Sequence, residues 1–532
     1  MAQMPTALKL VLFLVMLSMI ALLELAIIPR VHGPFRYVSE VRAKATHFRP
    51  TVSIDKFIPS PEEDLDDVQK SRLSAVRQAM VHAWSSYEKN AFGADEVGPV
   101  SGTRRQDVWG GIGVTLVDSL DTLYIMGMHD EFQRARDWVA NEMDFSHLGK
   151  DGGTISVFEV IIRQLGGLLS AYDLSQDEVF KKRAVEFANM LLPAFEDNVF
   201  YTHYNVYAQT SKLTNYYWWQ RGLLADFGSL QLEMRYLSDI TGNPEYAAKG
   251  DAFYEVVRRE GSYQNTGLFP IDFEPAYGTF AKTDSFITFG ARGDSFYEYL
   301  LKVWIYSGKH DSFLRETYDA AVDGMERYLL VHSEPDDAYY LQELLIPSME
   351  GSPKQDHLLC FVPGMLALGT LGETNATKVA RHLDLAKKLM QTCYTMYSRQ
   401  PTGLAPDMVE FPGYRVLESS YHLRPETVES LMYLYRITND TTYREWGWHL
   451  FESLEKYAKT THGYGTVHHV DDLKTYYIED KMESFFLAET LKYHYMLQTS
   501  SSFLPLDKYV LNTEAHPLTI NHAANKSKNV PS

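Results

Sequence analysis

Two neighbouring stretches, SVFEVIIRQLGGLLSAY (156–172) and EVFKKRAVEFANMLLPAF (178–195), show the pattern that decides the fold. Both carry apolar residues at helical spacing. The first is mostly apolar and has a carboxylate near its start, so it predicts a buried helix with an acidic end. The second has one charged face and one apolar face, which is typical of a helix at a protein surface.

Helices of these two kinds alternate along most of the chain, and we count about fourteen from the apolar periodicity. They are expected to begin near Leu65, Thr115, Glu131, Ser156, Asp177, Leu223, Pro244, Asp294, Asp311, His357, Thr377, Pro425, Thr441 and Lys481. Acidic or polar motifs fall on every second helix, at Asp118/Asp121, Glu159, Glu233, Asp294, His357, Glu426 and Glu483/Glu489. Paired helices in two concentric rings would produce this alternation, with the inner ring facing a central cavity. We therefore predict an all-α fold, a single α/α barrel, in which short pieces such as 464–470 and 474–480 form β-hairpins.

Composition limits the classes of partner. The net charge of −19 over 532 residues argues against nucleic acid, because a phosphate binder needs a basic face. Neutral, sugar-like substrates or cations are compatible with this charge. The aromatic content of 13% suits stacking on sugars, but packed helices use the same residues.

The N-terminus carries a targeting feature. Residues 10–28 are apolar apart from Glu24, close to the roughly 20 residues that a membrane span requires. We favour an uncleaved anchor after a short tail (1–9), although Val31-His32-Gly33 could serve as a signal-peptide cleavage site. More basic residues follow the span than precede it, which by charge alone favours a cytosolic body. A proline-containing stem (29–65), a body (66–520) and a tail (521–532) would follow.

Two cysteines and three glycosylation sequons bear on the compartment. Cys360 and Cys393 would restrict the unfolded chain by roughly 3–4 kcal/mol as a disulfide, or act as small core residues if they are free thiols. The sequons at Asn375, Asn439 and Asn525 suggest a lumenal body, because such sites are glycosylated in secreted proteins.

The acidic helix starts have ordinary explanations when taken singly. Pro425-Glu426 is a common way to begin a helix, and Asp294 stands in a sound capping region. Glu159 lies inside an apolar run, with Arg163 one turn on as a possible ion-pair partner. Together, however, crowded carboxylates can push their pKa values apart, and glycoside hydrolysis needs one acid and one base. A hard cation such as calcium would relieve the crowding, and without an EF-hand loop its site must be assembled from distant residues.

Seven blocks of this sequence resemble the class I α-1,2-mannosidases, glycoside hydrolase family 47. They are DSLDTLYIMGM (118–128), FEVIIRQLGGLLSAY (158–172), GARGDSFYEYLLKVW (290–304), HLLCFVPGMLALG (357–369), RPETVESLMYLYR (424–436), MESFFLAETLKY (482–493) and LNTEAHPL (511–518). The resemblance runs from about Arg104 to Ile520 and implies a barrel of seven helical hairpins, (α/α)7. It also implies hydrolysis of terminal α-1,2-linked mannose from high-mannose N-glycans, with inversion of the anomeric configuration.

The resemblance assigns roles that the residues alone do not. Glu159 and Asp294 match positions associated with proton donation, Glu426 matches the base that activates water, and Thr513 matches the residue that holds Ca²⁺. Other positions that match around the pocket are Arg163, Glu233, Glu298, His357, Arg424, Glu429, Phe485, Glu489 and Glu514, of which Phe485 would lie under the sugar ring. Cys360 and Cys393 match the family's disulfide pair, which implies a lumenal body in the endoplasmic reticulum or Golgi, anchored as a single-pass type II protein.

Arg292 bears on specificity. It stands two positions before the Asp of G-D-S, where the chain resembles the endoplasmic reticulum type of these enzymes. That type is associated with removal of one middle-branch mannose from the nine-mannose glycan. An ion pair between this Arg and a loop carboxylate is the simpler explanation. Two other functions stay open: a lectin-like quality-control factor for misfolded glycoproteins, and a Golgi-type enzyme that removes several mannoses. We expect a monomer.

Overall fold

The computed structural model describes residues 60–196, 199–200, 202–212 and 221–521. The expected tail (1–9), anchor (10–28), most of the stem and residues 522–532 lie outside the described residues. In the part of the chain that is described, no helix is long and apolar enough to span a bilayer.

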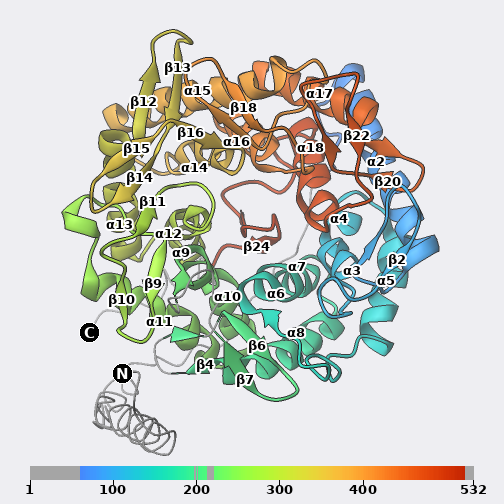
Figure 1. Ribbon diagram of the computed structural model, residues 1–532. Helices are drawn as coiled ribbons and strands as arrows, with labels where there is room; N and C mark the ends of the chain where they lie inside the picture. The colour runs from blue at the N-terminus through green and yellow to red at the C-terminus, as the bar shows by residue number, and fades with distance from the viewer. Residues whose placement is uncertain (1–59, 197–198, 201, 213–220, 522–532) are drawn as a thin grey trace, which may run out of the picture. The chain divides into compact units, whose positions relative to one another are not determined.

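The described body is a ring of helices in two layers (Figure 1). The outer helices are α2 (Asp67–Ala91), α5 (His129–Asn141), α8 (Glu178–Leu191), α11 (Pro244–Glu260), α13 (Ser312–Gly324), α15 (Ala376–Ser398) and α17 (Thr442–Tyr457). The inner segments are α3–α4 (Val114–Asp118, Leu120–Ile125), α6–η2–α7 (Val157–Val160, Ile161–Leu165, Gly166–Ser175), α9–α10 (Leu224–Gly228, Gln231–Thr241), α12 (Asp294–Tyr306), η6–α14 (Leu358–Phe361, Val362–Leu368), α16 (Glu426–Thr438) and η7–α18 (Phe486–Thr490, Leu491–Gln498). Outer and inner segments alternate along the chain, and α18 packs against α2 to close the ring. The expectation of an all-α barrel of seven helical hairpins is confirmed.

Burial follows the two patterns in the sequence. Inner helix α12 buries every residue from Ser295 to Tyr306, because it is covered by neighbours on all sides. Outer helix α8 buries one stripe, including Phe180, Ala184 and Phe187, and turns its charged residues to water. Side-chain caps start several outer helices, as at Asp177, whose carboxylate accepts a hydrogen bond from the amide of Val179 (3.0 Å).

Short antiparallel strands occupy the connections between helices. They are β1 (Glu96–Val97), β2 (Arg104–Arg105), β3 (Ile155–Ser156), β4 (Phe195–Glu196), β5 (Val199–Phe200), β6 (His203–Asn205), β7 (Thr210–Lys212), β8 (Gly222–Leu223), β9 (Asp272–Glu274), β10 (Thr279–Phe280), β11 (Ser285–Ile287), β12 (Leu330–Ser333), β13 (Ala338–Leu341), β14 (Glu343–Ile346), β15 (Glu350–Ser352), β16 (Lys354–Asp356), β17 (Met408–Glu410), β18 (Arg415–Glu418), β19 (Lys459–Thr460), β20 (Gly463–Tyr464), β21 (Val467–His468), β22 (Tyr477–Ile478), β23 (Tyr509–Leu511) and β24 (Pro517–Thr519). The predicted pieces 464–470 and 474–480 do pair, through β21 and β22.

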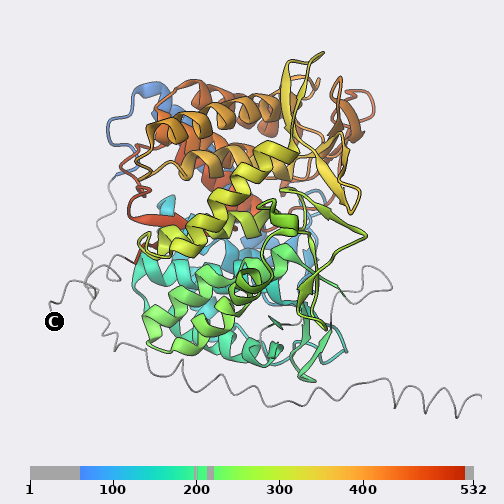
Figure 2. The same ribbon diagram turned by 90° about the vertical axis from the view of Figure 1, so that its left-hand side faces the viewer.

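Most hairpins gather at one end of the barrel, whereas β23–β24 enters from the other (Figure 2). The loop between β23 and β24 reaches the middle of the ring, where Figure 1 places β24. The two cysteines form a disulfide with a Cα–Cα distance of 5.8 Å, which joins η6 to α15 within one helical hairpin.

Candidate functional site

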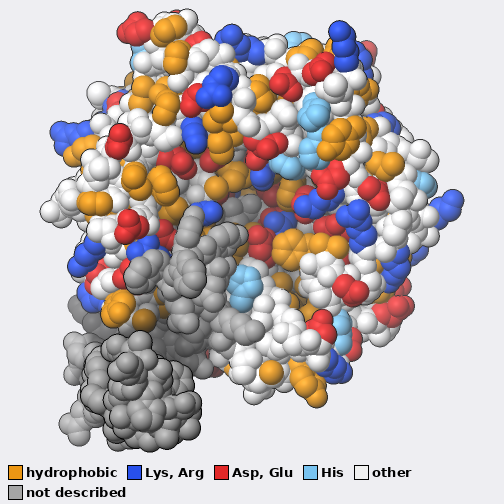
Figure 3. Space-filling model, in the orientation of Figure 1, with side chains coloured by type: hydrophobic (Ala, Val, Ile, Leu, Met, Phe, Trp, Pro, Cys, Tyr) orange, Lys and Arg blue, Asp and Glu red, His pale blue; other side chains and the backbone are white. Residues whose placement is uncertain are grey.

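A cavity of about 470 Å³ lies in the middle of the ring. Acidic and basic side chains meet around the hollow at the centre of the face in Figure 3. Most of its lining comes from the N-terminal ends of inner helices and from the β23–β24 loop. The polar lining residues are Ser156, Glu159, Arg163, His203, Asp226, Arg292, Asp294, Ser295, Arg424, Glu426, Glu489, Thr513 and Glu514.

On one wall, Arg163 holds two carboxylates. Its Nε donates a hydrogen bond to Glu159 (2.9 Å), and a second nitrogen makes a close ion pair with Glu514. Arg163 stands in the π-helical turn η2, which offsets its side chain from the regular helix in a way often found at functional sites. Its guanidinium also lies 5.8 Å from the centre of the Phe485 ring, which lines the cavity. The wall therefore combines fixed charges with an aromatic face.

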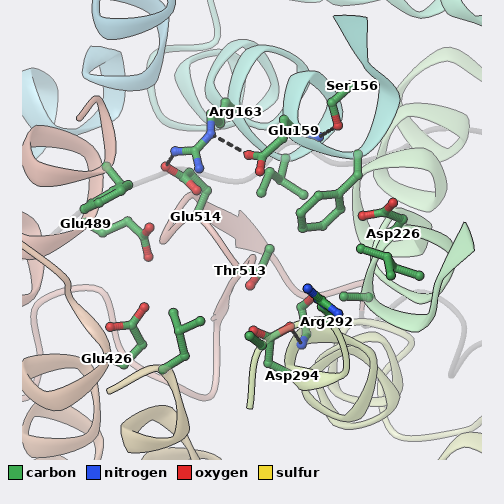
Figure 4. Close-up of a pocket in the computed structure, with 18 of the residues that line it drawn as sticks. Ser156, Glu159, Arg163, Asp226, Arg292, Asp294, Glu426, Glu489, Thr513 and Glu514 are labelled. Atoms are coloured by element: carbon green, nitrogen blue, oxygen red, sulfur yellow. Dashed lines mark hydrogen bonds and ion pairs between the residues drawn. The ribbon is translucent and has the colours of Figure 1, made fainter. Parts of the chain in front are cut away.

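The opposite wall carries Glu426 at the first turn of α16 (Figure 4). His357 lies behind it, 1% exposed, with its Nδ1 3.1 Å from the Glu426 carboxylate. The other ring nitrogen lies 2.7 Å from the Tyr397 hydroxyl, which can donate to it. A neutral imidazole with its proton on Nδ1 satisfies both contacts. His357 thus orients Glu426 from behind and does not line the cavity itself.

Asp294 and Arg292 come from the turn that starts α12. Burial raises the pKa of Asp294 to about 8. The negative charges of Asp356, Glu298 and Glu426 raise this pKa further, whereas the hydrogen bond from the backbone amide of Ser295 lowers it. Asp294 is therefore protonated near neutral pH. Arg292 has a positive φ of 76°, unusual for a residue with a side chain, and such backbone strain is frequent at functional sites.

The loop between β23 and β24 brings Thr513 to the cavity floor. Asn512, fully buried, fixes this loop: its Oδ1 accepts from the amides of Glu514 (2.9 Å) and His516 (2.8 Å). Its Nδ2 donates to the carbonyl of Ile162 (3.0 Å) and to Glu233 (2.7 Å). The loop approaches α7 closely because Gly166 carries no side chain, since a Cβ there would lie 2.8 Å from Asn512 Nδ2.

Buried charges support the same loop from below. His516 is sandwiched between Asp121 (2.8 Å) and Asp118 (3.1 Å), and although burial opposes its charge these carboxylates raise its pKa. Lys492 donates to the carbonyl of Ala515 (2.9 Å), and Lys302 donates to that of Asn512 (3.2 Å). The floor is therefore held by two ion pairs and two lysine hydrogen bonds from three inner segments.

Further buried carboxylates lie around Asn512 and Lys302. Burial raises the pKa of Glu233 to about 7 and that of Glu429 to about 8. The pKa of Glu489 is raised well above its usual value by burial and by the charges of Glu426 and Glu429. Glu298 makes a close ion pair with Lys302. One oxygen of Glu233 is buried without a hydrogen-bond partner.

These residues fit a hard cation bound partly through water. In the described ranges, no three His, Cys, Asp or Glu side chains are placed to ligate one metal together. Thr513 lines the cavity together with Glu489 and Glu514, and these side chains offer only oxygen atoms, the ligand type that calcium prefers. A cation there would also offset the repulsion from Glu426 and Glu429 that adds to burial in raising the pKa of Glu489.

The structure brings most of the predicted site residues to one cavity. The residues that line it are Glu159, Arg163, Arg292, Asp294, Arg424, Glu426, Phe485, Glu489, Thr513 and Glu514. Glu233, Glu298, Glu429 and His357 lie behind the lining. Arg424 donates to Asp407 (2.7 Å), which fixes its position at the cavity edge.

Sequence reasoning missed several residues of this site. Asp226 lines the cavity from α9, and burial, together with the charge of Glu159, raises its pKa to about 7. Asn512 and Lys302 were also missed. Lys302 gave a usable signal, because a lysine inside an otherwise apolar helix needs buried carboxylate partners. Asp226 gave none, since it follows an ordinary Leu-Ala pair in a short segment.

Comparisons with known proteins agree with this architecture. The model of glycosyl hydrolase family 47 matches residues 79–520. The endoplasmic reticulum mannosyl-oligosaccharide 1,2-alpha-mannosidase of Homo sapiens is 42% identical over 461 residues, which are 84% of this chain and 64% of that protein. A mannosyl-oligosaccharide 1,2-alpha-mannosidase of Arabidopsis thaliana is 43% identical over 466 residues, 86% of this chain and 80% of that protein.

A solved structure shows the same fold. The alpha-1,2-mannosidase from Trichoderma reesei superposes with a TM-score of 0.77 at 28% sequence identity, and the match covers 85% of this chain and 99% of that one. This chain spans slightly less than two thirds of the human relative.

Proposed function

The chain belongs to glycosyl hydrolase family 47, and we propose that it is a calcium-dependent, inverting α-1,2-mannosidase that trims high-mannose N-glycans. One observation carries the proposal: Glu159, Asp294 and Glu426 come from three distant helices and line one cavity. An inverting glycosidase needs an acid on one side of the sugar and a base on the other. Figure 4 shows Glu159, Asp294 and Glu426 around one open centre, so a sugar can lie between Glu426 and either of the other two carboxyl groups.

Asp294 supplies the proton in this proposal. Its pKa of about 8 keeps the carboxyl group protonated at neutral pH, so it can donate to the leaving oxygen. Glu159, held by Arg163 on another side of the same cavity, orients the sugar or a water molecule there. Glu426, oriented by His357, acts as the base that takes a proton from the attacking water.

Calcium would be held by Thr513, with Glu489, Glu514 and the carboxylates below holding its water ligands. Bound there, the ion would supply positive charge that orients sugar hydroxyls in the cavity. Phe485 offers an aromatic face for the sugar ring. The surrounding side chains bind and orient the terminal mannose and keep bulk water away.

The finer specificity rests on Arg292. Its guanidinium stands at the cavity edge and could hold several hydroxyls of the penultimate sugars. We propose that the preferred step removes one mannose from the nine-mannose glycan. Trimming of several mannoses, as a Golgi-type enzyme would do, is the alternative and predicts a different product pattern.

The cellular setting is also a proposal. The body would lie in the lumen of the endoplasmic reticulum or Golgi as a monomer, attached by residues 10–28. Support comes from the Cys360–Cys393 disulfide, which requires an oxidising compartment, and from relatives named as endoplasmic reticulum enzymes.

Digestion of a nine-mannose glycan by the purified protein tests the proposal. Free mannose with inverted configuration is expected in calcium, its release should stop with a chelator, and calcium should restore it. Identification of the eight-mannose isomer tests the role of Arg292, with Arg292→Leu expected to broaden the product range. Glycan binding without cleavage in calcium would instead indicate a lectin-like quality-control factor.

A further inference from the structure

We infer that Asn375 and Asn439 carry N-linked oligosaccharides at the end of the barrel opposite the cavity. Both begin Asn-X-Thr triplets, Asn375-Ala376-Thr377 and Asn439-Asp440-Thr441. The inference rests on the proposed lumenal body. The third triplet, at Asn525, lies outside the described residues.

Asn375 stands at the start of α15. The residue is exposed and caps α15, where its Oδ1 accepts hydrogen bonds from the amides of Thr377 (3.1 Å) and Lys378 (3.2 Å). The cap uses the oxygen only, so Nδ2 can carry a sugar while the helix start stays intact. Thr377 is exposed as well.

Asn439 ends the next inner helix. It is exposed, has a left-handed φ of 56°, and its amide donates to the carbonyl of Tyr435 (2.8 Å). This backbone shape is a regular helix ending that asparagine tolerates well. Thr441 is exposed and makes no side-chain cap to α17.

Chain direction places both sites at the same end. Inner segments η6–α14 and α16 begin at the cavity, where Leu358 and Glu426 line it, and they run away from it. The connections that follow therefore lie at the far end, with Asn375 and Asn439 in them. Lys309, which follows inner helix α12, donates to the carbonyl of Leu371 (2.7 Å) and ties two of these far-end connections together.

The same end holds the base of the β23–β24 hairpin. The amide of Asn521, just after β24, donates to the carbonyl of Tyr306 at the end of α12 (3.0 Å). Sugars at Asn375 and Asn439 would therefore surround the closed end of the barrel. The mouth of the cavity would stay clear of them, so another molecule, and not the carrier itself, would trim these sugars.

The attachment chemistry requires an oligosaccharide carried on a lipid pyrophosphate. The asparagine amide nitrogen forms a bond to the anomeric carbon, the bond from that carbon to the phosphate oxygen breaks, and the amide loses a proton. The lipid pyrophosphate leaves, so no oxidant or reductant is needed.

Expression of the full chain in eukaryotic cells tests the inference. Digestion with a peptide N-glycosidase should convert both asparagines to aspartates, which peptide mass spectrometry detects. Thr377→Ala and Thr441→Ala should each remove one sugar chain and shift the gel mobility by one step. The Asn375→Asp variant keeps the cap oxygen and should lose the sugar without losing thermal stability, whereas Asn375→Ala should lose both.

The Cys360–Cys393 disulfide serves as an internal reporter of the compartment. Oxidised cysteines together with unmodified Asn375 and Asn439 would overturn the inference while leaving the proposed enzyme untouched. Reduced cysteines and unmodified asparagines would overturn both the lumenal placement and the inference. Release of mannose by the purified protein, measured on the same sample, tests the proposed function separately.

Discussion

Replacement of Asn512 by Ala tests whether this side chain holds the β23–β24 loop in the shape that binds calcium. The change removes four buried hydrogen bonds, two from the amides of Glu514 and His516 and two to Ile162 and Glu233. A buried polar group without a partner costs about 1–3 kcal/mol, and water entering the vacated space offsets part of this. We therefore expect the free energy of unfolding to fall by about 3–5 kcal/mol.

The effect on calcium is more specific. In the wild-type protein, calcium at 100 times its Kd should add about 2.7 kcal/mol to stability, and a 100-fold weaker site would leave only about 0.4 kcal/mol. Because Asn512 positions the backbone around Thr513, the variant should lose most of this increment. Urea unfolding with calcium and with chelator measures it without reference to activity.

Asn205 provides a matched control. It is also buried, and its side chain donates to the carbonyls of Gly149 (3.0 Å) and Gly153 (2.8 Å), away from the β23–β24 loop. Asn205→Ala should lower stability and keep the full calcium increment. An Asn512→Ala protein with the wild-type increment would refute the idea that this side chain builds the metal floor.

The other predictions concern the proposed acid, the proposed base and the disulfide. Glu426→Gln should lower kcat by at least about 100-fold while glycan binding persists, as measured by mannose release and calorimetry; near-normal turnover would exclude it as the base. The kcat should fall as pH rises through about 8, where Asp294 loses its proton. Asp294→Asn should remove most of the kcat and also this loss of activity at alkaline pH. A wild-type kcat that stays constant up to pH 10 would contradict the role of Asp294 as the acid. Cys360→Ala with Cys393→Ala should lower the free energy of unfolding by about 3–4 kcal/mol in chemical denaturation, and an unchanged midpoint would disagree with the loop-entropy estimate.

The fold could be predicted from the sequence because the inner and outer helices differ in how completely they are buried. The expected start near Pro244 coincides with α11, and the one near Asp294 coincides with α12. The last inner segment was harder. It begins at Phe486, five residues after the expected Lys481, because residues 481–483 have no regular secondary structure and residue 484 lies in a turn before the π-helical turn η7.

The site was harder to predict from the sequence, because its residues come from distant segments that meet only in the folded chain. Periodicity alone pointed to Glu159, which is a carboxylate in an apolar run. Thr513 is an ordinary loop residue by composition, and only the resemblance of its block singled it out. The location of His357 behind Glu426 could not be predicted, because it depends on the packing of η6 against α16.

The β23–β24 hairpin has a consequence for biosynthesis. Residues 509–519 leave the ribosome after every helix of the described body, yet they complete the centre of the ring. A nascent chain can pair its helices early, but Lys302 and Lys492 lack their carbonyl acceptors, and Asp118 and Asp121 lack His516, until this hairpin arrives. Maturation of the protein should therefore depend on synthesis through residue 519, and premature stop codons just upstream of this hairpin should yield aggregation-prone, inactive protein.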